Sequence, residues 1–420
     1  MDNVTIKPAM LKGKVNIPPS KSMAHRAVIA AALSEGECIV SNIVMSDDIS
    51  ATLGGLRALG YKFSYNQKLK RVKFNAGRRK LTGSEIEIDC GESGSTLRFL
   101  IPIALLTGKD IKFICHGRLL QRPMKPYFDM FEKCGIIYEK GSDYIRTKGK
   151  LEPGVFMIAG NISSQFISGL LFALPLLDND SEIVITASPE STGYIDMTLD
   201  TLNRFGIRVK NRSYLRYVIS GNQSYKTKDI VVEGDYSQAA FFLTAGAIGC
   251  DVECLGLPEH SLQGDREIID IIERAGGIIE KTVEGIKAKH TSNMHGITVD
   301  ARNIPDLIPA VAVMLSFCKG ESKIINAGRL RMKESDRLAA ICDELSQLGI
   351  DIQEGGDYIK INGAQTAHCQ TVSARSDHRI AMALAIAACR CEGDEVLILG
   401  ALSAVKKSYP DFFDVYKKLI

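Results

Sequence analysis

The 420-residue chain has no tryptophan, and aromatic residues make up only 7% of it. No uninterrupted apolar stretch reaches the roughly 20 residues that a membrane-spanning helix needs. The net charge of +3 is too small to indicate binding to nucleic acid or to a membrane surface, and no basic tract stands out. The first residues lack the charged and apolar segments of a secretory signal. We therefore expect a cytoplasmic protein, long enough for two domains with full cores.

The eleven cysteines are scattered along the chain, and many of them lie within apolar segments. This distribution is typical of reduced, buried thiols in the cytosol. Neither Cys250 with Cys254 nor Cys389 with Cys391 has the partner ligands of a zinc site nearby. We expect neither a metal nor a cofactor.

Long apolar helical segments recur about every 70 residues, and each opens with Ser or Asp, side chains favoured at helix N-caps. The predicted openings are Ser22, Ser95, Ser163, Ser237, Asp306 and Ser376. A second marker has the same period, because amphipathic segments end at a glycine that can form a left-handed helix cap. These glycines are Gly60, Gly135, Gly206, Gly276 and Gly349. Two independent markers with one period indicate six copies of one structural unit.

Each unit is predicted to contain a strand, a buried helix, a strand, an amphipathic helix and two further strands, a βαβαββ unit of the α/β class. The sixth copy lacks its closing strands, whereas Val4–Ile6 and Lys14–Ile17 supply two strands before the first helix. The simplest interpretation is that the N-terminus completes the last unit. The chain would then form two three-unit lobes, one of residues 19–226 and one of residues 1–18 with 227–420. Helices that are apolar nearly all round favour closed lobes with helices inside over an open array.

Cations lie at or within one turn of the predicted helix starts, namely at Lys21, Arg26, Arg98 and Arg379. The helix dipole disfavours cations in a first turn. The same first turn offers free N–H groups to an anion. The pattern therefore predicts a site for phosphate or carboxylate groups.

Several loops with chemically useful side chains fall at the same phase of the repeat. Gly91–Arg98 is a glycine-spaced loop that runs into a helix and lets backbone N–H groups approach a phosphate closely. It is neither a Walker loop nor a dinucleotide fingerprint. Asn303–Asp306 places a carboxylate at a helix start, and Leu330–Arg337 gathers charges of both signs. A carboxylate among cations stays ionised, and a Lys beside Arg can have a lowered pKa, which is a setting for acid–base chemistry beside a bound anion.

At these positions the chain resembles the 5-enolpyruvylshikimate-3-phosphate synthase (3-phosphoshikimate 1-carboxyvinyltransferase) family of enolpyruvyl transferases. The resemblance runs essentially end to end, in segments listed here in chain order: Pro19–Arg26, Gly91–Arg98, Arg122–Met124, Ser163–Phe166, Gly193–Thr198, Gly234–Phe241, Asn303–Asp306, Leu330–Arg337, Asp377–Met382 and Lys406–Phe413. It implies the two-lobed enolpyruvyl transferase fold, an inside-out α/β barrel of six βαβαββ units, three per lobe. It also implies transfer of the enolpyruvyl group of phosphoenolpyruvate to the 5-hydroxyl of shikimate 3-phosphate, with lobe closure around both ligands, on the route to chorismate and aromatic amino acids.

Carried over residue by residue, the resemblance implies three sets of site residues. Catalytic residues would be Lys21, Asp306 and Glu334. Contacts with shikimate 3-phosphate would come from Lys21, Ser22, Arg26, Ser163, Ser164, Gln165, Tyr194, Asp306 and Lys333. Contacts with phosphoenolpyruvate would come from Lys21, Gly94, Arg122, Gln165, Arg337, Arg379 and Lys407. The resemblance implies no metal, and Gly94 implies sensitivity to glyphosate, which occupies the phosphoenolpyruvate site in the family. We expect a monomer without nucleic-acid or membrane partners.

The sequence departs from the commonest family pattern at Glu92, Phe99 and Arg329. Two rival functions share the scaffold. The sister activity on UDP-N-acetylglucosamine uses a cysteine in a loop that corresponds to His116–Pro123, which contains no cysteine here. A non-catalytic sensor of phosphorylated metabolites could lack Asp306 or Glu334, and both are present. Release of phosphate from phosphoenolpyruvate with shikimate 3-phosphate distinguishes all three.

Overall fold

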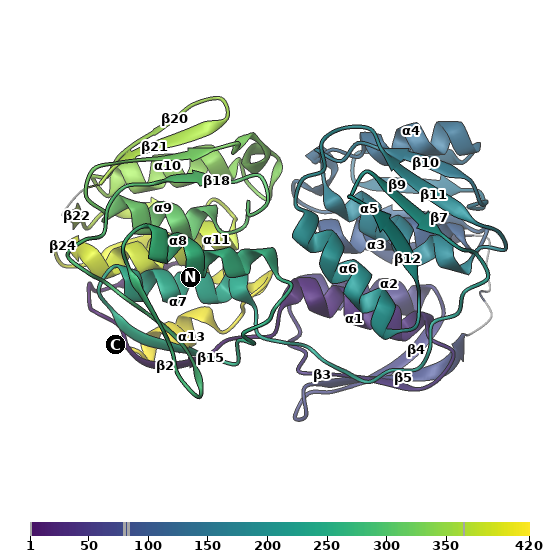
Figure 1. Cartoon of the computed structure of the whole chain (residues 1–420), viewed down its shortest axis with the longest axis horizontal. Helices are drawn as coiled ribbons and strands as arrows, with labels where there is room; N and C mark the ends of the chain where they lie inside the picture. Colours follow the sequence, from purple (N-terminus) through teal and green to yellow (C-terminus); the bar gives the residue numbers. More distant parts are fainter. Residues whose placement is uncertain (1, 79–80, 82–84, 364–365) are drawn as a thin grey trace. The chain divides into compact units, whose positions relative to one another are not determined.

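The computed structural model describes residues 2–78, 81, 85–363 and 366–420 and divides into two compact units (Figure 1). We call Lys21–Val232 the N-terminal lobe, and Met1–Ser20 with Glu233–Ile420 the C-terminal lobe. The sequence-based boundaries lay at residues 18/19 and 226/227. The N-terminal lobe extends to Val232 because Ile230 pairs with Val40 and because Asn42 Nδ2 donates to the carbonyl oxygen of Val232 at 2.6 Å.

The N-terminal lobe contains three repeats, each with one inner and one outer helix. The first consists of α1 (Lys21–Leu33), β3 (Cys38–Ser41), α2 (Asp47–Ala58), β4 (Tyr61–Asn66) and β5 (Arg71–Arg78). The second consists of β6 (Glu85–Asp89), α3 (Gly94–Leu105), β7 (Asp110–Ile114), η1 (Leu119–Gln121), α4 (Lys125–Cys134), β8 (Ile137–Lys140) and β9 (Tyr144–Lys148). The third consists of β10 (Val155–Ile158), α5 (Ser164–Ala173), η2 (Leu174–Leu176), β11 (Ser181–Ile185), α6 (Thr192–Arg204), β12 (Val209–Arg212) and β13 (Arg216–Ile219), and β14 (Ile230–Val231) follows.

The C-terminal lobe repeats this order. Its first repeat consists of α7 (Tyr236–Ala247), β15 (Asp251–Leu255), η3 (Gly264–Glu267), α8 (Ile268–Arg274), β16 (Ile278–Lys281) and β17 (Gly285–Lys289). Its second consists of β18 (Thr298–Asp300), α9 (Ile308–Ser316), β19 (Glu321–Ile325), η4 (Gly328–Met332), α10 (Arg337–Gln347), β20 (Asp351–Glu354) and β21 (Tyr358–Asn362). Its third consists of β22 (Ala367–His368), β23 (Thr371–Ser373), α11 (His378–Ala387), η5 (Ala388–Arg390), β24 (Cys391–Glu392), β25 (Val396–Leu399), α12 (Ala401–Lys406) and α13 (Phe412–Lys417).

In the second, third, fifth and sixth repeats, the strand before the inner helix pairs in parallel with the strand after it. In the second repeat β6 pairs in parallel with β7, and the hairpin β8–β9 continues the sheet in antiparallel fashion. The order β6-β7-β9-β8 recurs as β10-β11-β13-β12 and β18-β19-β21-β20. Right-handed crossover through a helix is the usual way to join parallel strands, and it leaves one helix on the inner face of each sheet. The predicted βαβαββ unit is confirmed.

The first and fourth repeats exchange their leading strands. β2 (Lys12–Asn16) precedes α1 but pairs in parallel with β15, whereas β14 precedes α7 but pairs in parallel with β3. β1 (Val4–Ile6) pairs antiparallel with β25 and takes the place of a closing strand in the last repeat. The prediction that both N-terminal strands complete the last unit is therefore correct for β1 and wrong for β2. Val15 and Ile17 are buried in the core of the C-terminal lobe, which places β2 beside β15.

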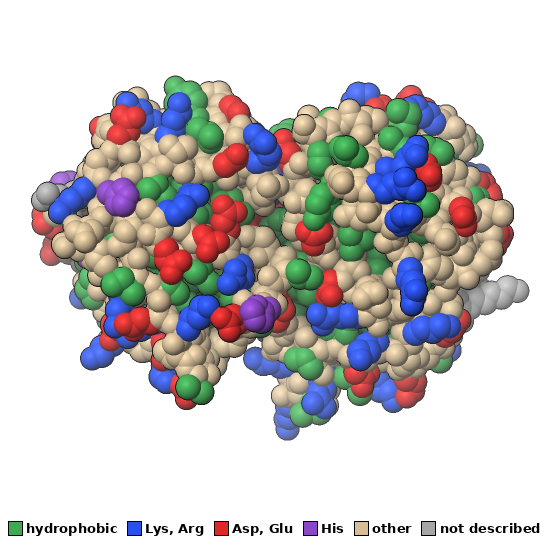
Figure 2. Space-filling model, in the orientation of Figure 1, with side chains coloured by type: hydrophobic (Ala, Val, Ile, Leu, Met, Phe, Trp, Pro, Cys, Tyr) green, Lys and Arg blue, Asp and Glu red, His purple; other side chains and the backbone are tan. Residues whose placement is uncertain are grey.

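The inner helices are apolar all round because side chains surround them on every side. Every residue of α7, α9 and α11 is buried, and in α3 only Ser95 is not. α3 packs against α5 in the N-terminal lobe, and α7, α9 and α11 pack against one another in the C-terminal lobe. On the face of each lobe seen in Figure 2, cationic and anionic side chains are interspersed. Across the described residues, no helix combines the length and apolar character needed to cross a membrane.

Most inner helices begin one or two residues away from the predicted caps. Ser163 caps α5 as predicted, and its Oγ accepts from the backbone N–H of Gln165. The caps of α3, α7 and α11 are Ser93, Asp235 and Asp377, so the predictions of Ser95, Ser237 and Ser376 are wrong. α1 begins at Lys21 and α9 at Ile308, so Ser22 and Asp306 are not caps either. An extended backbone with a side-chain oxygen aimed at the first turn defines a cap, and two Ser or Asp in close sequence compete for that position.

Candidate active site

The inner helices of the N-terminal lobe begin without compensating acidic residues. α1, α3 and α5 have no acidic side chain in the first turn, whereas the outer helix α2 has Asp47 and Asp48 there. The partial positive charge of a helix start is normally balanced by such carboxylates. The starts of α1, α3 and α5 are therefore suited to an anionic ligand.

Lys21 is the first residue of α1, and its ammonium group is held by a neighbouring carboxylate. Lys21 Nζ donates to Asp48 Oδ2 at 2.8 Å, and the two side chains are only 17% and 8% exposed. The partly buried ion pair holds the ammonium group at the start of the helix. A lysine fixed in this way can contact an anion or exchange a proton with it.

Arg26, predicted to contact ligand, is buried and makes several bonds within the protein. Its Nε donates to Thr198 Oγ1 at 2.8 Å, and its Nη1 and Nη2 donate to the carbonyl oxygens of Ser22 and Tyr194 at 2.7 and 2.8 Å. Burial lowers the pKa of the guanidinium to about 10. These bonds join α1 to the start of α6, which brings the predicted residues Ser22 and Tyr194 together.

Gly94 lies against two arginine side chains. A Cβ atom at Gly94 would lie 2.9 Å from Nη1 of both Arg122 and Arg98. Arg98 Nη1 donates to Gln165 Oε1 at 2.6 Å, and its Nη2 donates to the carbonyl oxygen of Pro123 at 3.1 Å. Gln165 Nε2 in turn donates to Ser95 Oγ at 3.0 Å. The structure therefore brings together the predicted residues Gly94, Arg122 and Gln165 at the starts of α3 and α5.

The start of α5 carries the remaining predicted residues of this lobe. Ser163 is the cap, Ser164 is the first helical residue and is buried, and Gln165 is partly exposed. Glu92, which departs from the family pattern, is exposed, and its carboxylate lies against Gly117 of the following loop. The nearest neighbours of a Cβ at Gly94 are cationic guanidinium groups, so the glycine loop presents positive charge at this point.

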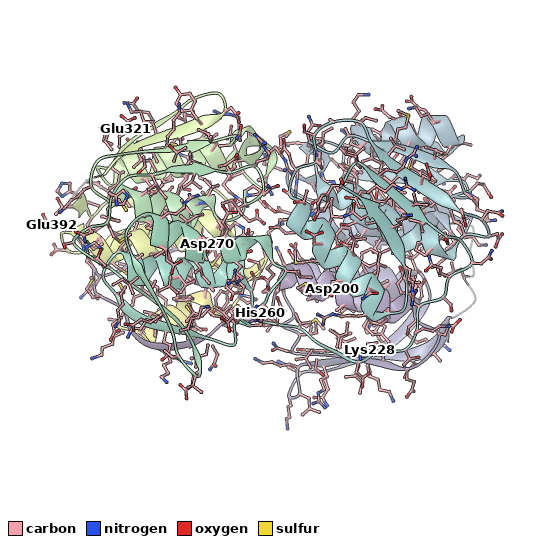
Figure 3. The ribbon with its side chains drawn as sticks, viewed as in Figure 1. Asp200, Lys228, His260, Asp270, Glu321 and Glu392 are labelled. Atoms are coloured by element: carbon pink, nitrogen blue, oxygen red, sulfur yellow. The ribbon has the colours of Figure 1, made fainter. Side chains whose placement is uncertain are left out.

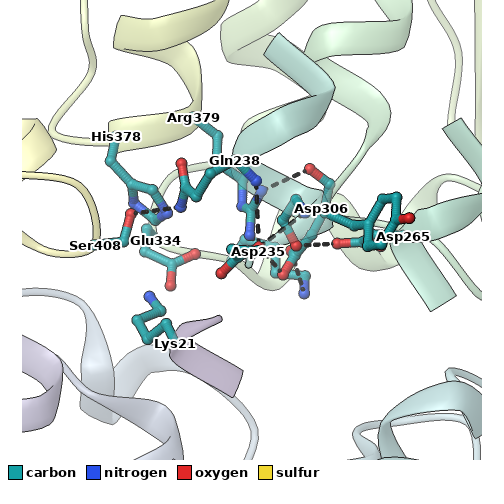
Figure 4. A network of polar contacts seen from close by, with 12 residues as sticks. Lys21, Asp235, Gln238, Asp265, Asp306, Glu334, His378, Arg379 and Ser408 are labelled. Carbon is teal, nitrogen blue, oxygen red and sulfur yellow. Dashed lines mark hydrogen bonds and ion pairs between the residues drawn. The ribbon is translucent and has the colours of Figure 1, made fainter. Parts of the chain in front are cut away.

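Asp306 is the centre of the cluster in the C-terminal lobe (Figure 4). Its Oδ1 accepts from Lys333 Nζ at 3.2 Å and from Arg337 Nη1 at 2.9 Å. Its Oδ2 accepts from Arg379 Nη2 at 3.1 Å, and Arg379 Nη1 donates to its carbonyl oxygen at 3.0 Å. Because Asp306 precedes α9 and is not its cap, its carboxylate points to cations from two other segments. Four predicted site residues thus meet at one point.

Arg337 is held by carboxylates from three segments. Its Nε and Nη2 donate to Asp377 Oδ2 and Oδ1 at 2.9 and 3.3 Å, and its Nη2 also donates to Glu334 Oε2 at 2.7 Å. Burial opposes the charge of this side chain, but the charges of Asp377, Glu334 and Asp306 outweigh burial and raise its pKa. Arg337 therefore fixes the positions of Asp306 and Glu334.

Lys333 and Asp265 have pKa values close to neutrality. Burial lowers the pKa of Lys333 to about 8, although the charge of Asp306 opposes this effect. Burial, together with the charge of Asp306, raises the pKa of Asp265 in η3 to about 7. Ser237 Oγ donates to Asp265 Oδ2, which connects Asp265 to the start of α7. Groups that titrate near neutral pH suit proton transfer and often mark functional sites.

The last predicted residue, Lys407, lies buried at the end of α12. Its neighbour Ser408 accepts a hydrogen bond from Gln238 Nε2 at 3.2 Å, which ties this segment to the first turn of α7 (Figure 4). Asp235 caps the same turn, where its Oδ1 accepts from the N–H groups of Ser237 and Gln238.

Sequence reasoning missed several polar residues of these clusters. Asp48 and Asp377 are the carboxylate partners of Lys21 and Arg337, but an acid near a helix start also fits ordinary capping. Arg98 had been noted as a cation without an assigned contact. Asp265 gave no signal, because it lies at none of the predicted helix starts and in none of the segments that carry the family resemblance. Over the ranges that the structure describes, no group of three or more His, Cys, Asp or Glu is arranged to hold a metal ion.

Comparisons with known proteins agree over nearly the whole chain. A family model described as EPSP synthase (3-phosphoshikimate 1-carboxyvinyltransferase) matches residues 6–416. The 3-phosphoshikimate 1-carboxyvinyltransferases of Clostridium novyi (strain NT) and Clostridium perfringens (strain SM101 / Type A) are 46% and 48% identical to the chain, with 100% of the chain and 98% of each relative covered. The solved EPSP synthase of Acinetobacter baumannii superposes with a TM-score of 0.80 at 24% identity, covering 99% of this chain and 97% of the other. The enolpyruvyl transferase NikO of Streptomyces tendae gives 0.78 at 16% identity, with 99% and 97% covered.

Proposed function

The chain belongs to the EPSP synthase family, and on this basis we propose that it transfers the enolpyruvyl group of phosphoenolpyruvate to the 5-hydroxyl of shikimate 3-phosphate and releases phosphate. The observation that carries the proposal is the Asp306 carboxylate bound by Lys333, Arg337 and Arg379. A carboxylate held in this way can act as a base while the neighbouring cations bind anionic substrates. The cations and unbalanced helix starts suit two ligands that both carry phosphate.

The chemistry requires an addition followed by an elimination. The 5-hydroxyl oxygen bonds to C2 of phosphoenolpyruvate, and a proton is added at C3, which gives a tetrahedral intermediate. Loss of phosphate from C2 and of a proton from C3 then forms the enolpyruvyl ether. In the proposal Asp306 takes the hydroxyl proton, and Lys21 and Glu334 exchange protons at C3 and at the leaving oxygen. Cations close to the leaving phosphate stabilise its developing charge.

The substrate contacts follow from the two clusters. We propose that shikimate 3-phosphate binds to Lys21, Ser22, Ser163, Ser164, Gln165, Tyr194, Asp306 and Lys333, with Arg26 holding Ser22 and Tyr194 in place as well as facing the ligand. We propose that phosphoenolpyruvate binds to Lys21, Gly94, Arg122, Gln165, Arg337, Arg379 and Lys407. The packing of Arg122 against Gly94 and the link from Arg98 through Gln165 to Ser95 support the second set.

The test is a phosphate-release assay with the purified chain, phosphoenolpyruvate and shikimate 3-phosphate. We expect release that depends on both substrates, together with a product that carries the enolpyruvyl group. The same assay with UDP-N-acetylglucosamine in place of shikimate 3-phosphate should release none. Phosphate release with UDP-N-acetylglucosamine but not with shikimate 3-phosphate would overturn the proposal in favour of the sister activity. Binding of the substrates without phosphate release would overturn it in favour of a sensor.

The sister activity on UDP-N-acetylglucosamine is disfavoured by the loop before Arg122. The segment His116–Pro123 contains no cysteine, and Cys115, which precedes it, is only 5% exposed. We further propose that the protein acts as a monomer in the cytoplasm, which suits its eleven free cysteines. Size-exclusion chromatography with light scattering tests the oligomeric state.

A further inference from the structure

A line of buried hydroxyl groups crosses the N-terminal lobe from α1 to α3. His25 Nδ1 lies 2.8 Å from Thr52 Oγ1, which lies 2.7 Å from Thr96 Oγ1. Thr96 Oγ1 donates to Ser93 Oγ at 2.8 Å. His25, Thr52, Thr96 and Ser93 are each at most 1% exposed. The four side chains therefore form a continuous hydrogen-bonded chain that water does not reach.

One end of this chain lies directly before Gly94, and the other lies on the helix that begins with Lys21. Ser93 caps α3 directly before Gly94, where its Oγ accepts from the backbone N–H of Thr96 at 3.1 Å. Thr96 Oγ1 also lies 3.4 Å from the carbonyl oxygen of Asp48, the residue whose carboxylate holds Lys21. His25 belongs to the same helix as Lys21. The hydroxyl chain thus joins the second turns of α1 and α2 to the first turn of α3.

The direction of the protons follows from the number of donors. Each hydroxyl carries one proton, and the proton of Thr96 points to Ser93 Oγ or to the Asp48 carbonyl oxygen, in both cases away from Thr52. Thr52 must therefore donate to Thr96, and His25 must donate to Thr52 from Nδ1. Burial holds the pKa of His25 down to about 3, so the imidazole is neutral at physiological pH and has one proton. Because Nδ1 is the donor to Thr52, Nε2 carries none. No hydrogen-bond partner reaches Nε2 among the described residues, which agrees with this tautomer.

We propose that His25, Thr52, Thr96 and Ser93 are positioning residues that hold the Gly94 loop in register with the Lys21–Asp48 ion pair. The inference rests on the proposed function, in which Gly94 and Lys21 both contact phosphoenolpyruvate. Hydrogen bonds in a buried chain reinforce one another, and a buried donor or acceptor left without its partner is costly. Removing one hydroxyl therefore releases the loop, although none of the four side chains needs to touch substrate.

The kinetic test removes single hydroxyl groups without changing side-chain shape. Thr52→Val and Thr96→Val should each raise the KM for phosphoenolpyruvate about tenfold and leave the KM for shikimate 3-phosphate within about twofold. The double variant should resemble the single ones, because one break already interrupts the chain. The control is Thr201→Val, which removes another buried hydroxyl that donates to the Met197 carbonyl oxygen within α6. Equal KM values for phosphoenolpyruvate in the two variants and the control overturn the proposal.

Two further measurements do not depend on catalytic activity. Nitrogen NMR of the wild-type protein should show neutral His25 with its proton on Nδ1, and the Nε2–H form contradicts the assigned proton direction. Hydrogen exchange in residues 89–97 should accelerate in Thr52→Val and Thr96→Val but not in Thr201→Val, and unchanged exchange overturns the proposal. These readouts apply even if wild-type protein fails to turn over the two substrates, a result that would reject the proposed function alone.

Discussion

Arg337 and Asp377 form a buried ion pair inside the C-terminal lobe. Arg337 Nε lies 2.9 Å from Asp377 Oδ2, and the side chains are 1% and 0% exposed. Both residues lie at helix starts, where sequence reasoning assigned the arginine to a substrate. Much of its charge is instead balanced by carboxylates within the protein, which gives it a structural role beside any role in binding.

Replacing Arg337 with Met should remove the cation that Asp377 and Glu334 share. Breaking a buried ion pair typically costs about 3–5 kcal/mol, so the free energy of unfolding of Arg337→Met should fall by about that amount. Arg331→Met is the matched control, because Arg331 pairs with Asp336 and Glu354 while its side chain is 31% exposed. A partly exposed pair should cost about 1 kcal/mol or less. Urea titration compares them, and equal losses would contradict the structural role.

Asp306→Asn and Glu334→Gln should each lower kcat by about 10²–10⁴-fold. The amides keep the shape of the side chains but cannot take up a proton. Dissociation constants of the substrates should change much less than kcat. Glu321→Gln on β19 is the control, since Glu321 is exposed and pairs only with Lys360 among the ion pairs described (Figure 3). A variant with near-normal kcat would remove that residue from the mechanism.

The affinity for shikimate 3-phosphate should fall as pH rises through about 8, because Lys333 then loses its charge. The contribution of Lys333 to the free energy of unfolding changes with pH in the opposite direction. The pKa of Lys333 is lower in the folded state, so between pH 8 and 10.5 the unfolded state binds more protons, and stability from this group rises with pH. Lys333→Arg should keep the affinity nearly constant to about pH 9.5, since arginine stays protonated. Calorimetric titration with shikimate 3-phosphate from pH 6.5 to 9.5 measures the affinity. If the affinity of Lys333→Arg falls with pH as in the wild type, a group other than Lys333 causes the fall.

Asp265 should make the protein less stable as pH rises from 4 to 7. Its folded-state pKa of about 7 lies above the ordinary 3.8, so the folded state binds more protons in this window, and stability falls as the group ionises. Asp265→Asn should be nearly neutral at pH 4 and stabilising by about 2–4 kcal/mol at pH 8. Asp270→Asn, at an exposed position on α8 (Figure 3), serves as the control. The midpoints of urea unfolding at both pH values test this prediction. An Asp265→Asn variant that is less stable than the wild type at pH 8 would contradict it.

Gly94→Ala should raise the inhibition constant of glyphosate more than the KM for phosphoenolpyruvate. The new methyl group would lie 2.9 Å from Arg122 Nη1 and from Arg98 Nη1, so the loop or these guanidinium groups must shift. A methyl-sized clash costs about 1–3 kcal/mol, roughly tenfold to a hundredfold in affinity. Inhibition of both enzymes at varied phosphoenolpyruvate measures the ratio. A wild-type enzyme that is already insensitive would show that the departure from the family pattern at Glu92 outweighs the effect of the glycine.

The sequence predicted those parts of the fold that depend on local pattern. Apolar helices, capping glycines and alternating strands recur with one period, so the six units and their inner helices were accessible without coordinates. The pairing of β2 with β15 was not, because parallel pairing joins residues about 240 positions apart and leaves no local signal. The predicted caps Ser95 and Ser237 lie two residues after the actual caps Ser93 and Asp235, because all four are residue types that favour capping.

The candidate site also has a part that the sequence predicted and a part that it did not. Cations at helix starts were visible in the sequence, and the structure brings Lys333, Arg337 and Arg379 to Asp306. Their partners within the protein were not visible, since Asp48 and Asp377 also fit capping. The hydroxyl chain from His25 to Ser93 could not be predicted, because Thr52 and Thr96 are 44 residues apart and meet only when α2 and α3 pack together.

The exchange of β2 and β14 sets the order in which the chain can be completed during synthesis. All strands of the N-terminal lobe, β14 included, have left the ribosome once Val232 has emerged, so this lobe can close while the second half is still being made. β1 and β2 are made first but pair with β25 and β15, which are made last and midway. The earliest residues must therefore remain unpaired until later segments arrive, and the lobe that holds the termini is the last to finish.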